Sequence, residues 1–412
     1  MGRGIAVFGT GYLGATHAAC MAELGHEVLG VDVDAGKLAR LGAGEAPFYE
    51  PGLDEVLKSN VDVGRLRFTS SYEEAAEFAN VHFIAVATPQ KQGEFAADLK
   101  YVDAVIETLA PLLTVPAVIF GKSTVPVGTA ARLGARAREL APVGDAVEVA
   151  WNPEFLREGY AVQDTLHPDR IVLGVEKNRP GHAEEVARDV YGLLLEEEIP
   201  FLVTDLETSE LVKTSANAFL ATKISFINAM AEVCEVTGAD VSVLADAIGH
   251  DARIGRKFLN AGIGFGGGCL PKDIRAFMAR AGELGANQAL TFLREVDCIN
   301  MRRRARMMEL TREVVGGSLI GARGNSGVIL SQILRGLADT FSPLDAVSGT
   351  DVAAGLRRAA DAAYEAVLRP VEGTILTVVR SAAESVERAV SEGETTLSGV
   401  LERAPQIGRA HV

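Results

Sequence analysis

Short apolar runs alternate with helical patterns along the first half of the chain. Each run has the length of a buried strand and is followed by glycine-rich or polar residues that end it. Strands that alternate with helices are typical of an α/β fold with a doubly wound, Rossmann-type parallel sheet, so we predict that fold. The predicted strands are Ile5–Phe8, Glu27–Val33, Val81–Val86, Ala117–Phe120, Val147–Ala150 and Ile171–Gly174.

The pattern changes to purely helical spacing at about Glu207. A long helix is predicted from Glu207 to Ala247, and further helices from Pro271 to Ala281 and from Gln288 to Val315. After Gly317 the chain is rich in alanine and its pattern stays helical. The apolar residues predicted to share one face of the first helix are Leu211, Ala218, Ile224, Ile227, Met230 and Val233.

These patterns predict four consecutive segments. Residues 1–204 are expected to form the Rossmann domain, and residues 205–316 an all-α central domain. Residues 317–406 are expected to form an all-α C-terminal fragment, followed by a short tail over residues 407–412.

A glycine motif joins the first predicted strand to the first helix. Gly9, Gly11 and Gly14 form the pattern G-x-G-x-x-G, and Asp32 ends the next strand. Such glycines permit a tight turn and close approach of a pyrophosphate, while the acid accepts hydrogen bonds from a ribose. A carboxylate at this position repels a 2′-phosphate, so the motif favours NAD over NADP.

Polar residues follow several other predicted strands. Thr88, Thr124, Glu154 and Glu158 all stand where a strand has just ended. Each of them alone is explained by a helix cap or a turn. Together they indicate one wall of a binding site, because ligands on doubly wound sheets lie beyond the carboxyl ends of the strands.

The glycine-rich stretch Gly262–Gly268 runs directly into Cys269, Lys272 and Asp273. Glycines let the backbone lie close to a ligand, and a thiol beside a lysine can lose its proton near neutral pH and act as a nucleophile. The alternative for a single cysteine is a buried structural residue, since free cysteine is among the most buried residue types.

Two polar residues of the long helix also suggest chemistry. Lys213 and Asn217 stand four residues apart and therefore share one side of the helix. Such a pair can donate hydrogen bonds to a developing oxyanion. From spacing alone, an exposed lysine beside a surface amide explains the same two residues.

The composition excludes several classes of protein. The 412 residues carry a formal net charge of −15, which argues against general binding to nucleic acid or to an acidic membrane. No apolar run reaches the roughly 20 residues that a membrane helix needs. The four cysteines match neither a zinc site nor a disulfide framework, so we predict no metal site and a reducing, cytoplasmic location.

Residues 1 to about 316 resemble the UDP-glucose/GDP-mannose dehydrogenase family. The matching motifs are FGTGYLG, KSTVPVGT, NPEFLREG, LHPDRIVLG, ELVKTSANAFLATKISFINAMAEVC and ARIGRKFLNAGIGFGGGCLPKD, in the family's order. One departure is Gly268, where the family commonly has serine. The resemblance implies an NAD-dependent UDP-glucose 6-dehydrogenase, and a homodimer formed through the central helices. The activity would be the four-electron oxidation of UDP-glucose to UDP-glucuronate through a cysteine thiohemiacetal and thioester; GDP-mannose oxidation is the alternative.

The resemblance also implies roles for individual residues. It implies that Cys269 is the nucleophile and that Lys213 and Asn217 stabilise the oxyanion, while Arg253 reaches across the dimer interface. The residues expected to take part in catalysis are Cys269, Lys213, Asn217, Asp273, Glu154, Glu158 and Thr124. NAD is expected at Gly9, Gly11, Tyr12, Leu13, Gly14, Asp32, Lys37, Thr88, Thr124 and Glu158. The nucleotide sugar is expected at Phe155, Leu156, Lys213, Asn217, Arg253, Asn260, Phe265 and Gly266.

The last quarter of the chain departs from this family. The family's third domain, which supplies part of the uridine and phosphate contacts, does not follow Gly317, so we expect impaired catalysis. Residues 317 to about 405 instead resemble part of the nucleotide-binding helical domain of dihydroxyacetone and fatty-acid kinases, with GARGNSG as its phosphate loop. The kinase's aspartate-rich magnesium motif is missing, so no kinase activity is expected. The tail 407–412 resembles a translated sequencing adapter, and a non-catalytic, chimeric NAD-binding protein is a third hypothesis.

Overall fold

A computed structural model describes residues 2–177, 179, 181–321, 324–341, 344, 347–367, 375–394, 396–397 and 399–400, with side chains omitted at 307–308 and 310–327. The chain divides into two compact units. The first consists of residues 1–261 and 265–297, and the second of residues 262–264 and 298–412. Each unit is described by itself. The domain boundaries expected near residues 204 and 316 stay predictions.

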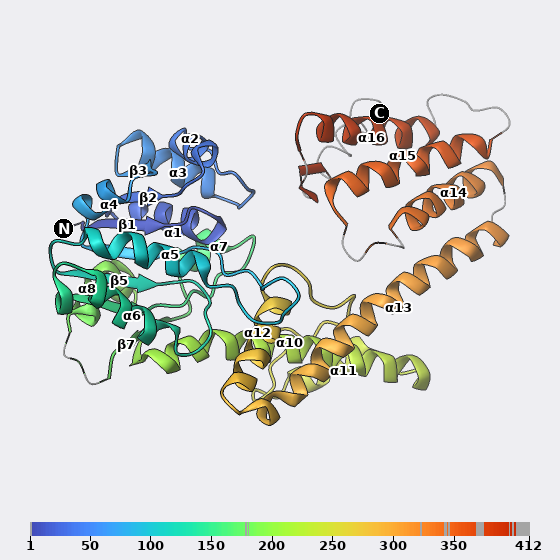
Figure 1. Cartoon of the computed structure of the whole chain (residues 1–412). Helices are drawn as coiled ribbons and strands as arrows, with labels where there is room; N and C mark the ends of the chain where they lie inside the picture. Colours follow the sequence, from blue (N-terminus) through green and yellow to red (C-terminus); the bar gives the residue numbers. More distant parts are fainter. Residues whose placement is uncertain are drawn as a thin grey trace. The chain divides into compact units, whose positions relative to one another are not determined.

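An eight-stranded sheet lies at the centre of the first unit, in the order β3-β2-β1-β4-β5-β6-β7-β8 (Figure 1). The change of direction from β1 to β4 is the point at which doubly wound sheets bind ligands. This confirms the predicted α/β, Rossmann-type fold. The pattern missed β3 and β8. The strands are β1 Gly4–Phe8, β2 Glu27–Val31, β3 Leu66–Thr69, β4 Val81–Ile84, β5 Ala117–Gly121, β6 Val147–Trp151, β7 Ile171–Val175 and β8 Phe201–Asp205.

The sheet is not wholly parallel, which corrects the sequence prediction. β6 and β7 pair antiparallel, with Trp151 opposite Gly174, whereas all other neighbouring strands are parallel. The chain between them holds only the short helix α7, Ala161–Leu166, and does not cross over the sheet. Residues 152–170 therefore stay at the edge where β1 and β4 to β6 end, which keeps NPEFLREG beside the dinucleotide motif.

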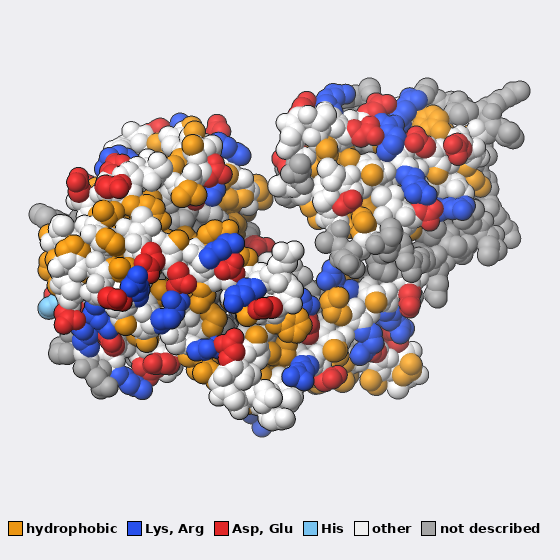
Figure 2. Space-filling view, viewed as in Figure 1, with side chains coloured by type: hydrophobic (Ala, Val, Ile, Leu, Met, Phe, Trp, Pro, Cys, Tyr) orange, Lys and Arg blue, Asp and Glu red, His pale blue; other side chains and the backbone are white. Residues whose placement is uncertain are grey.

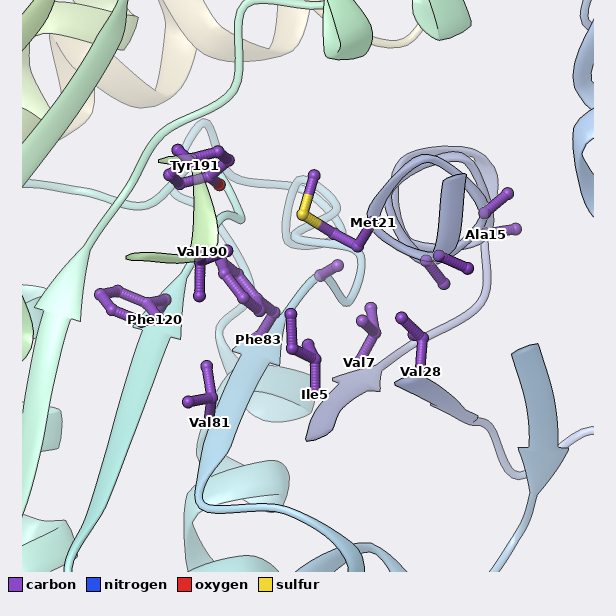
Figure 3. Packing of buried hydrophobic residues seen from close by; sticks show 14 of the residues in the cluster. Ile5, Val7, Ala15, Met21, Val28, Val81, Phe83, Phe120, Val190 and Tyr191 are labelled. Carbon is purple, nitrogen blue, oxygen red and sulfur yellow. The ribbon is translucent and has the colours of Figure 1, made fainter. Parts of the chain in front are cut away.

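The strands of the sheet supply two hydrophobic cores, because successive side chains of a strand point to opposite faces. Ile5 and Val7 of β1 join the core beneath α1, whereas Ala6 and Phe8 join the core beneath α5 and α6. Figure 3 shows the first core, with Phe83 near Phe120. The helices around the sheet are α1 Tyr12–Glu23, α2 Ala35–Gly42, α3 Leu53–Asp62, α4 Tyr72–Phe78, α5 Lys100–Leu109, α6 Thr129–Leu140, α8 Ala183–Val190 and α9 Gly192–Glu196.

The long helix predicted from Glu207 to Ala247 is two helices. α10 covers Leu206–Thr237 and ends at Gly238, whose φ of 74° is a left-handed cap that glycine adopts easily. Asp240 then accepts hydrogen bonds from the first turn of α11, Val241–Gly249. The predicted apolar face was also wrong at Val233, which is 51% exposed.

Two more helices complete the first unit and lead out of it. α12 covers Leu270–Glu283, and α13 covers Thr291–Gly321. The beginning of α13 packs on α10 and α12, because Leu293 and Val296 lie in one buried cluster with Ala218 and Ile274. The central region is therefore all-α, as predicted.

The second unit is helical as well, which confirms the predicted class of the C-terminal fragment. Its further helices are α14 Gly324–Phe341, α15 Gly349–Glu365 and α16 Ile375–Ser391. A capping box of Ser348 and Asp351 begins α15. Part of the predicted phosphate loop, residues 322–323, and the tail 407–412 lie outside the described residues.

Charged side chains of both signs are mixed over the visible face in Figure 2. Over the part of the chain that the structure describes, no helix combines the length and apolarity needed to cross a membrane.

Candidate active site

The three motif glycines have different surroundings. A Cβ at Gly9, where φ is 90°, would lie 2.8 Å from the Val86 side chain, and a Cβ at Gly14 would lie 1.7 Å from the Gly9 carbonyl oxygen. Apart from its own chain neighbours and the adjoining helix backbone, no heavy atom of the described residues lies within 4 Å of a Cβ placed at Gly11. Gly9 and Gly14 are thus required for packing, whereas Gly11 leaves open space at the N-terminus of α1. That space fits a dinucleotide pyrophosphate.

Asp32 lies at the end of β2 as the motif predicts, and its carboxylate is held by four hydrogen bonds. Its Oδ2 accepts from the Thr10 amide at 2.8 Å, the Thr10 hydroxyl at 2.9 Å and Lys37 Nζ at 3.0 Å, and Oδ1 accepts from the Asp34 amide at 3.1 Å. Burial opposes ionisation of Asp32, but these donors outweigh it and lower its pKa. The group is therefore an anion at neutral pH, suited to ribose hydroxyls.

The two threonines at strand ends lie together. Thr88 follows β4 and its hydroxyl donates to the Thr124 carbonyl at 2.8 Å. Ser123 donates to the Val86 carbonyl at 2.7 Å and ties the same two segments. The structure thus brings Thr88 and Thr124 to the carboxyl edge of the sheet.

Lys213 of α10 forms a buried ion pair with Glu154. The distance from Lys213 Nζ to Glu154 Oε1 is 2.9 Å, and the two side chains are 7% and 13% exposed. Glu154 Oε2 accepts from the Leu156 amide at 2.6 Å. The Lys213 ammonium also lies 5.7 Å from the centre of the Phe155 ring. The alternative of an exposed surface lysine is therefore wrong.

Asn217, one helical turn further on, contacts a buried carboxylate. Its Nδ2 donates to Asp273 Oδ2 at 2.7 Å, and Asp273 is 2% exposed. Lys272 Nζ lies 2.7 Å from the other oxygen, Asp273 Oδ1. Because Lys272 is already paired with Asp273, its charge is less available to the neighbouring thiol.

Cys269 is exposed and is the N-cap residue of α12, a position where the helix dipole favours a thiolate. Other groups act against ionisation. Partial burial of the thiol, followed by the charges of Asp273 and Glu154, raises the pKa of Cys269, and Lys213 only opposes this rise. The charge of Lys213 is thus not sufficient to lower the pKa of Cys269, and ionisation of this thiol near neutral pH stays a prediction.

A cavity of about 400 Å³ is lined by residues of α10 and of the segment after β6, and neither Cys269 nor Asp273 is among its lining residues. Lys213, Asn217, Glu154, Phe155 and Leu156 line it, as expected for a substrate site. Several lining residues were not predicted from the sequence, although Lys122 lies in the motif KSTVPVGT and Asn152 in the motif NPEFLREG. The lining residues that were not predicted include His17, Lys122, Asn152, Thr165, Arg170, Tyr191, Phe219, Lys257 and Phe258.

Three residues that were predicted to bind the substrate lie outside the wall of this cavity. Arg253 is exposed and pairs with Asp251, while exposed Asn260 accepts from Arg256 at 2.8 Å. Phe265 is 6% exposed and packs in one buried cluster with residues of α10 and α12, so its side chain faces a hydrophobic core. None of these side chains lines the cavity beside Lys213.

Comparison with known proteins gives family matches over most of the chain. The NAD binding domain of the UDP-glucose/GDP-mannose dehydrogenase family matches residues 3–194, and the central domain of that family matches residues 207–302. A UDP-glucose 6-dehydrogenase of Rhizobium meliloti is 43% identical over 319 residues, which cover 77% of this chain and 72% of the relative. One from Pseudomonas aeruginosa is 42% identical over 76% of this chain and 68% of its own length.

This chain belongs to the UDP-glucose/GDP-mannose dehydrogenase family. It is an NAD-dependent oxidoreductase, as the resemblance implied, and NAD is the cofactor that its motif favoured. The UDP-glucose dehydrogenase of Pyrobaculum islandicum has a similar structure, with a TM-score of 0.70 and 38% identity over 79% of this chain and 73% of that one. A GDP-mannose dehydrogenase of Pseudomonas aeruginosa gives a TM-score of 0.57 at 30% identity, over 76% and 71%.

The C-terminal part matches a different family. A DAK2 domain matches residues 282–412, which confirms the second resemblance found in the sequence. The match begins within the central domain of the dehydrogenase family, because residues 282–302 belong to both.

Proposed function

We propose that this member of the family oxidises the C6 alcohol of UDP-glucose to the carboxylate of UDP-glucuronate, a four-electron reaction. One observation carries the proposal: the exposed thiol Cys269 lies within electrostatic reach of Lys213, Glu154 and Asp273, which belong to the two buried polar pairs Lys213–Glu154 and Asn217–Asp273. NAD, when bound at Gly11 and Asp32, supplies the acceptor for the electrons removed in each of two oxidations.

Lys213 and Asn217 stabilise the negative charge that develops on the substrate oxygen. An ammonium has three N–H donors and an amide has two, so each residue keeps a donor for substrate while bonded to its carboxylate. Both are buried, at 6% and 7% exposure, and hydrogen bonds to a charge are strong where water is excluded. Their carboxylate partners fix the direction of these donors.

Cys269 makes the second oxidation possible. Its sulfur adds to the aldehyde carbon, and a carboxylate takes the thiol proton. Asp273 and Glu154 are candidates for this base, since their charges reach the thiol. The thiohemiacetal oxygen is held by the donors above. Loss of the second electron pair gives a thioester, and water attacks its carbonyl carbon, breaks the carbon–sulfur bond and returns the thiol.

Two alternatives to UDP-glucose oxidation stay open. The first is that GDP-mannose is the substrate, and the second is that the chain binds NAD but is not catalytic. Absorbance of NADH distinguishes all three. We expect formation of two NADH per UDP-glucose and the uronic acid as product, with slower turnover of GDP-mannose. Faster turnover of GDP-mannose would reverse the substrate assignment. NAD binding without turnover of either sugar nucleotide would support the non-catalytic hypothesis.

We also propose that the chain forms a homodimer through α10. Phe219, Phe226 and Val233 recur every seven residues on that helix and are 66%, 46% and 51% exposed. A row of exposed apolar side chains at this spacing is typical of a helix that packs on a partner. We also propose a cytoplasmic location, with which four free cysteines are consistent. The domain boundaries near residues 204 and 316 are proposed in the same way.

Light scattering on the full chain tests the dimer. Phe226→Asp places a charge in the apolar row, so we expect a monomer where the wild-type chain is a dimer. The matched control is Val63→Asp, because Val63 is 64% exposed at the end of α3, away from α10. A Phe226→Asp variant that stays dimeric would exclude α10 as the interface.

A further inference from the structure

A buried carboxylate connects the dinucleotide motif to the segment that carries Glu154 and Glu158. Glu50 is 5% exposed and lies in the loop between α2 and α3. Its Oε2 accepts from the Gly159 amide at 2.9 Å, and its Oε1 accepts from the Ala161 amide at 2.7 Å. The same Oε2 accepts from the hydroxyl of Tyr12. Glu50 therefore binds backbone more than a hundred residues away in the sequence.

Tyr12 belongs to the dinucleotide motif itself. It is the first residue of α1, where the backbone faces the open space in front of Gly11. The centre of its ring lies 5.0 Å from the centre of the Phe48 ring, and the Gly159 amide nitrogen lies 3.2 Å from its hydroxyl oxygen. Burial, followed by the hydrogen bond to Glu50, raises the pKa of Tyr12, so the phenol stays a donor.

The other end of this network is next to the chemistry. Gly159 directly follows Glu158, and Ala161 is the first residue of α7. Negative charge on Glu158 raises the pKa of both Tyr12 and Cys269, so Glu158 lies within electrostatic reach of both. The backbone of Tyr12 is thus expected to contact the cofactor, while its side chain helps to fix the turn after Glu158.

We propose that Tyr12 and Glu50 are positioning residues that couple NAD binding to the conformation of residues 154–161. NAD at the start of α1 restricts the backbone of Tyr12. The phenol then holds Glu50, and Glu50 holds the amides of Gly159 and Ala161. The consequence for binding of the sugar nucleotide rests on the proposed function, whereas the coupling itself needs only the cofactor.

Hydrogen exchange of the full chain, with and without saturating NAD, tests the coupling. In the wild-type chain we expect NAD to slow exchange at Gly159 and Ala161 by about tenfold or more. Tyr12→Phe removes only the hydroxyl, so it should bind NAD through its backbone yet lose most of this slowing. Tyr49→Phe is the control, because Tyr49 is 75% exposed and adjacent to Glu50.

Glu50→Gln gives a second test, in which an amide group can no longer accept at both positions. We expect faster exchange at Gly159 and Ala161 even without NAD. Glu23→Gln is the matched control: Glu23 accepts from Asn60 at 2.6 Å and touches neither amide. If the Glu50→Gln variant does not fold, the Tyr12→Phe variant still tests whether NAD binding is coupled to exchange at Gly159 and Ala161.

Two results would overturn the coupling. One is a wild-type chain whose exchange at these amides does not respond to bound NAD. The other is a Tyr12→Phe chain that binds NAD and shows the full wild-type slowing. Failure of the proposed function is a separate result, namely NAD binding with normal exchange behaviour but no oxidation of UDP-glucose.

Discussion

The two halves of the active site are constructed in different ways. The centre of the cofactor half lies within one strand–helix–strand unit and consists of glycine backbone and the acid Asp32, while Thr88, Thr124 and Glu158 are expected to add contacts from later segments. The half around Cys269 combines residues from three parts of the chain, in the pairs Lys213–Glu154 and Asn217–Asp273. The first half is shaped by local backbone geometry. In the second half, each buried polar group is stabilised by a hydrogen bond or ion pair to another buried group.

This difference predicts different sensitivities to mutation. Removing one member of a largely buried pair leaves the other without its partner, which is costly. Changing a residue of the cofactor half leaves the backbone donors at the start of α1 intact. The largest effects on activity should therefore come from the half around the thiol.

Replacing Cys269 should have the largest effect. Cys269→Ala removes the nucleophile, so formation of the uronic acid should fall by about 10⁴-fold or more, because no thioester can form. NAD affinity should stay within about twofold of wild type, since the cofactor half does not use the thiol. Steady-state NADH formation and a binding titration check both. Cys298→Ala is the control, because Cys298 is exposed on α13. Full product formation by Cys269→Ala would break the distinction between the halves.

Lys213→Met should come next. The variant keeps the length of the side chain but leaves Glu154 buried without its cation and removes a donor to the oxyanion. We expect kcat to fall by about 10²- to 10³-fold, with a smaller change in KM. The control is Lys223→Met, on the same helix, since Lys223 donates only to backbone carbonyls at Ile254 and Gly255. Equal effects of the two substitutions would show that Lys213 acts only by supporting the helix.

Glu210 of α10 binds the start of α6 and should make stability depend on pH. Its carboxylate is 2% exposed and accepts from the amides of Gly128 and Ala130 at 2.7 Å each, at the start of α6. Burial raises the pKa of Glu210 to about 7. The folded chain therefore holds this proton at pH values where the unfolded chain has lost it.

The contribution of Glu210 to stability is complete below about pH 4.5 and is lost as pH rises to about 7. A rise in pKa from 4.5 to about 7 corresponds to about 3 kcal/mol. Glu210→Gln should remove this part of the pH dependence, measured by denaturant unfolding between pH 4.5 and 8. An unchanged slope of stability against pH in the variant would contradict the raised pKa. Glu23→Gln should leave the slope as in wild type.

The smallest effect is expected in the cofactor half. Asp32→Asn removes the charge that repels a 2′-phosphate while Lys37 stays nearby, so the preference for NAD over NADP should fall by about tenfold, or about 1.4 kcal/mol. Dissociation constants for the two cofactors measure this change. Asp62→Asn, in an exposed pair with Lys58, is the control. An unchanged preference would mean that Asp32 does not select the cofactor.

The predictions from the sequence were most accurate where the signal is local. The strand before Gly9, the helix that follows it and the acid at Asp32 are present as predicted, although the helix begins at Tyr12 and not after Gly14. Local signals of this kind are reliable because a turn and its flanking periodicity are properties of consecutive residues. Lys213 and Asn217 were also predicted to share one side of a helix. Their burial was not predictable, since spacing alone equally fits a solvent-exposed side.

The sequence predictions failed where distant segments decide the outcome. The antiparallel pairing of β7 depends on a connection that does not cross the sheet, and strand periodicity contains no information about direction. The raised pKa of Cys269 depends on Asp273 and Glu154, and only the folded chain brings Glu154 near the thiol.

The amino-acid sequence by itself determined the α/β class, the dinucleotide motif with its acid, and the residue types of the thiol site. The tertiary structure alone decided which charges meet: Glu154 with Lys213, Asp273 with Asn217, and Glu50 with the turn after Glu158. The physical reason is that backbone conformation depends on neighbouring residues, whereas burial and charge pairing depend on segments that only the folded chain brings together.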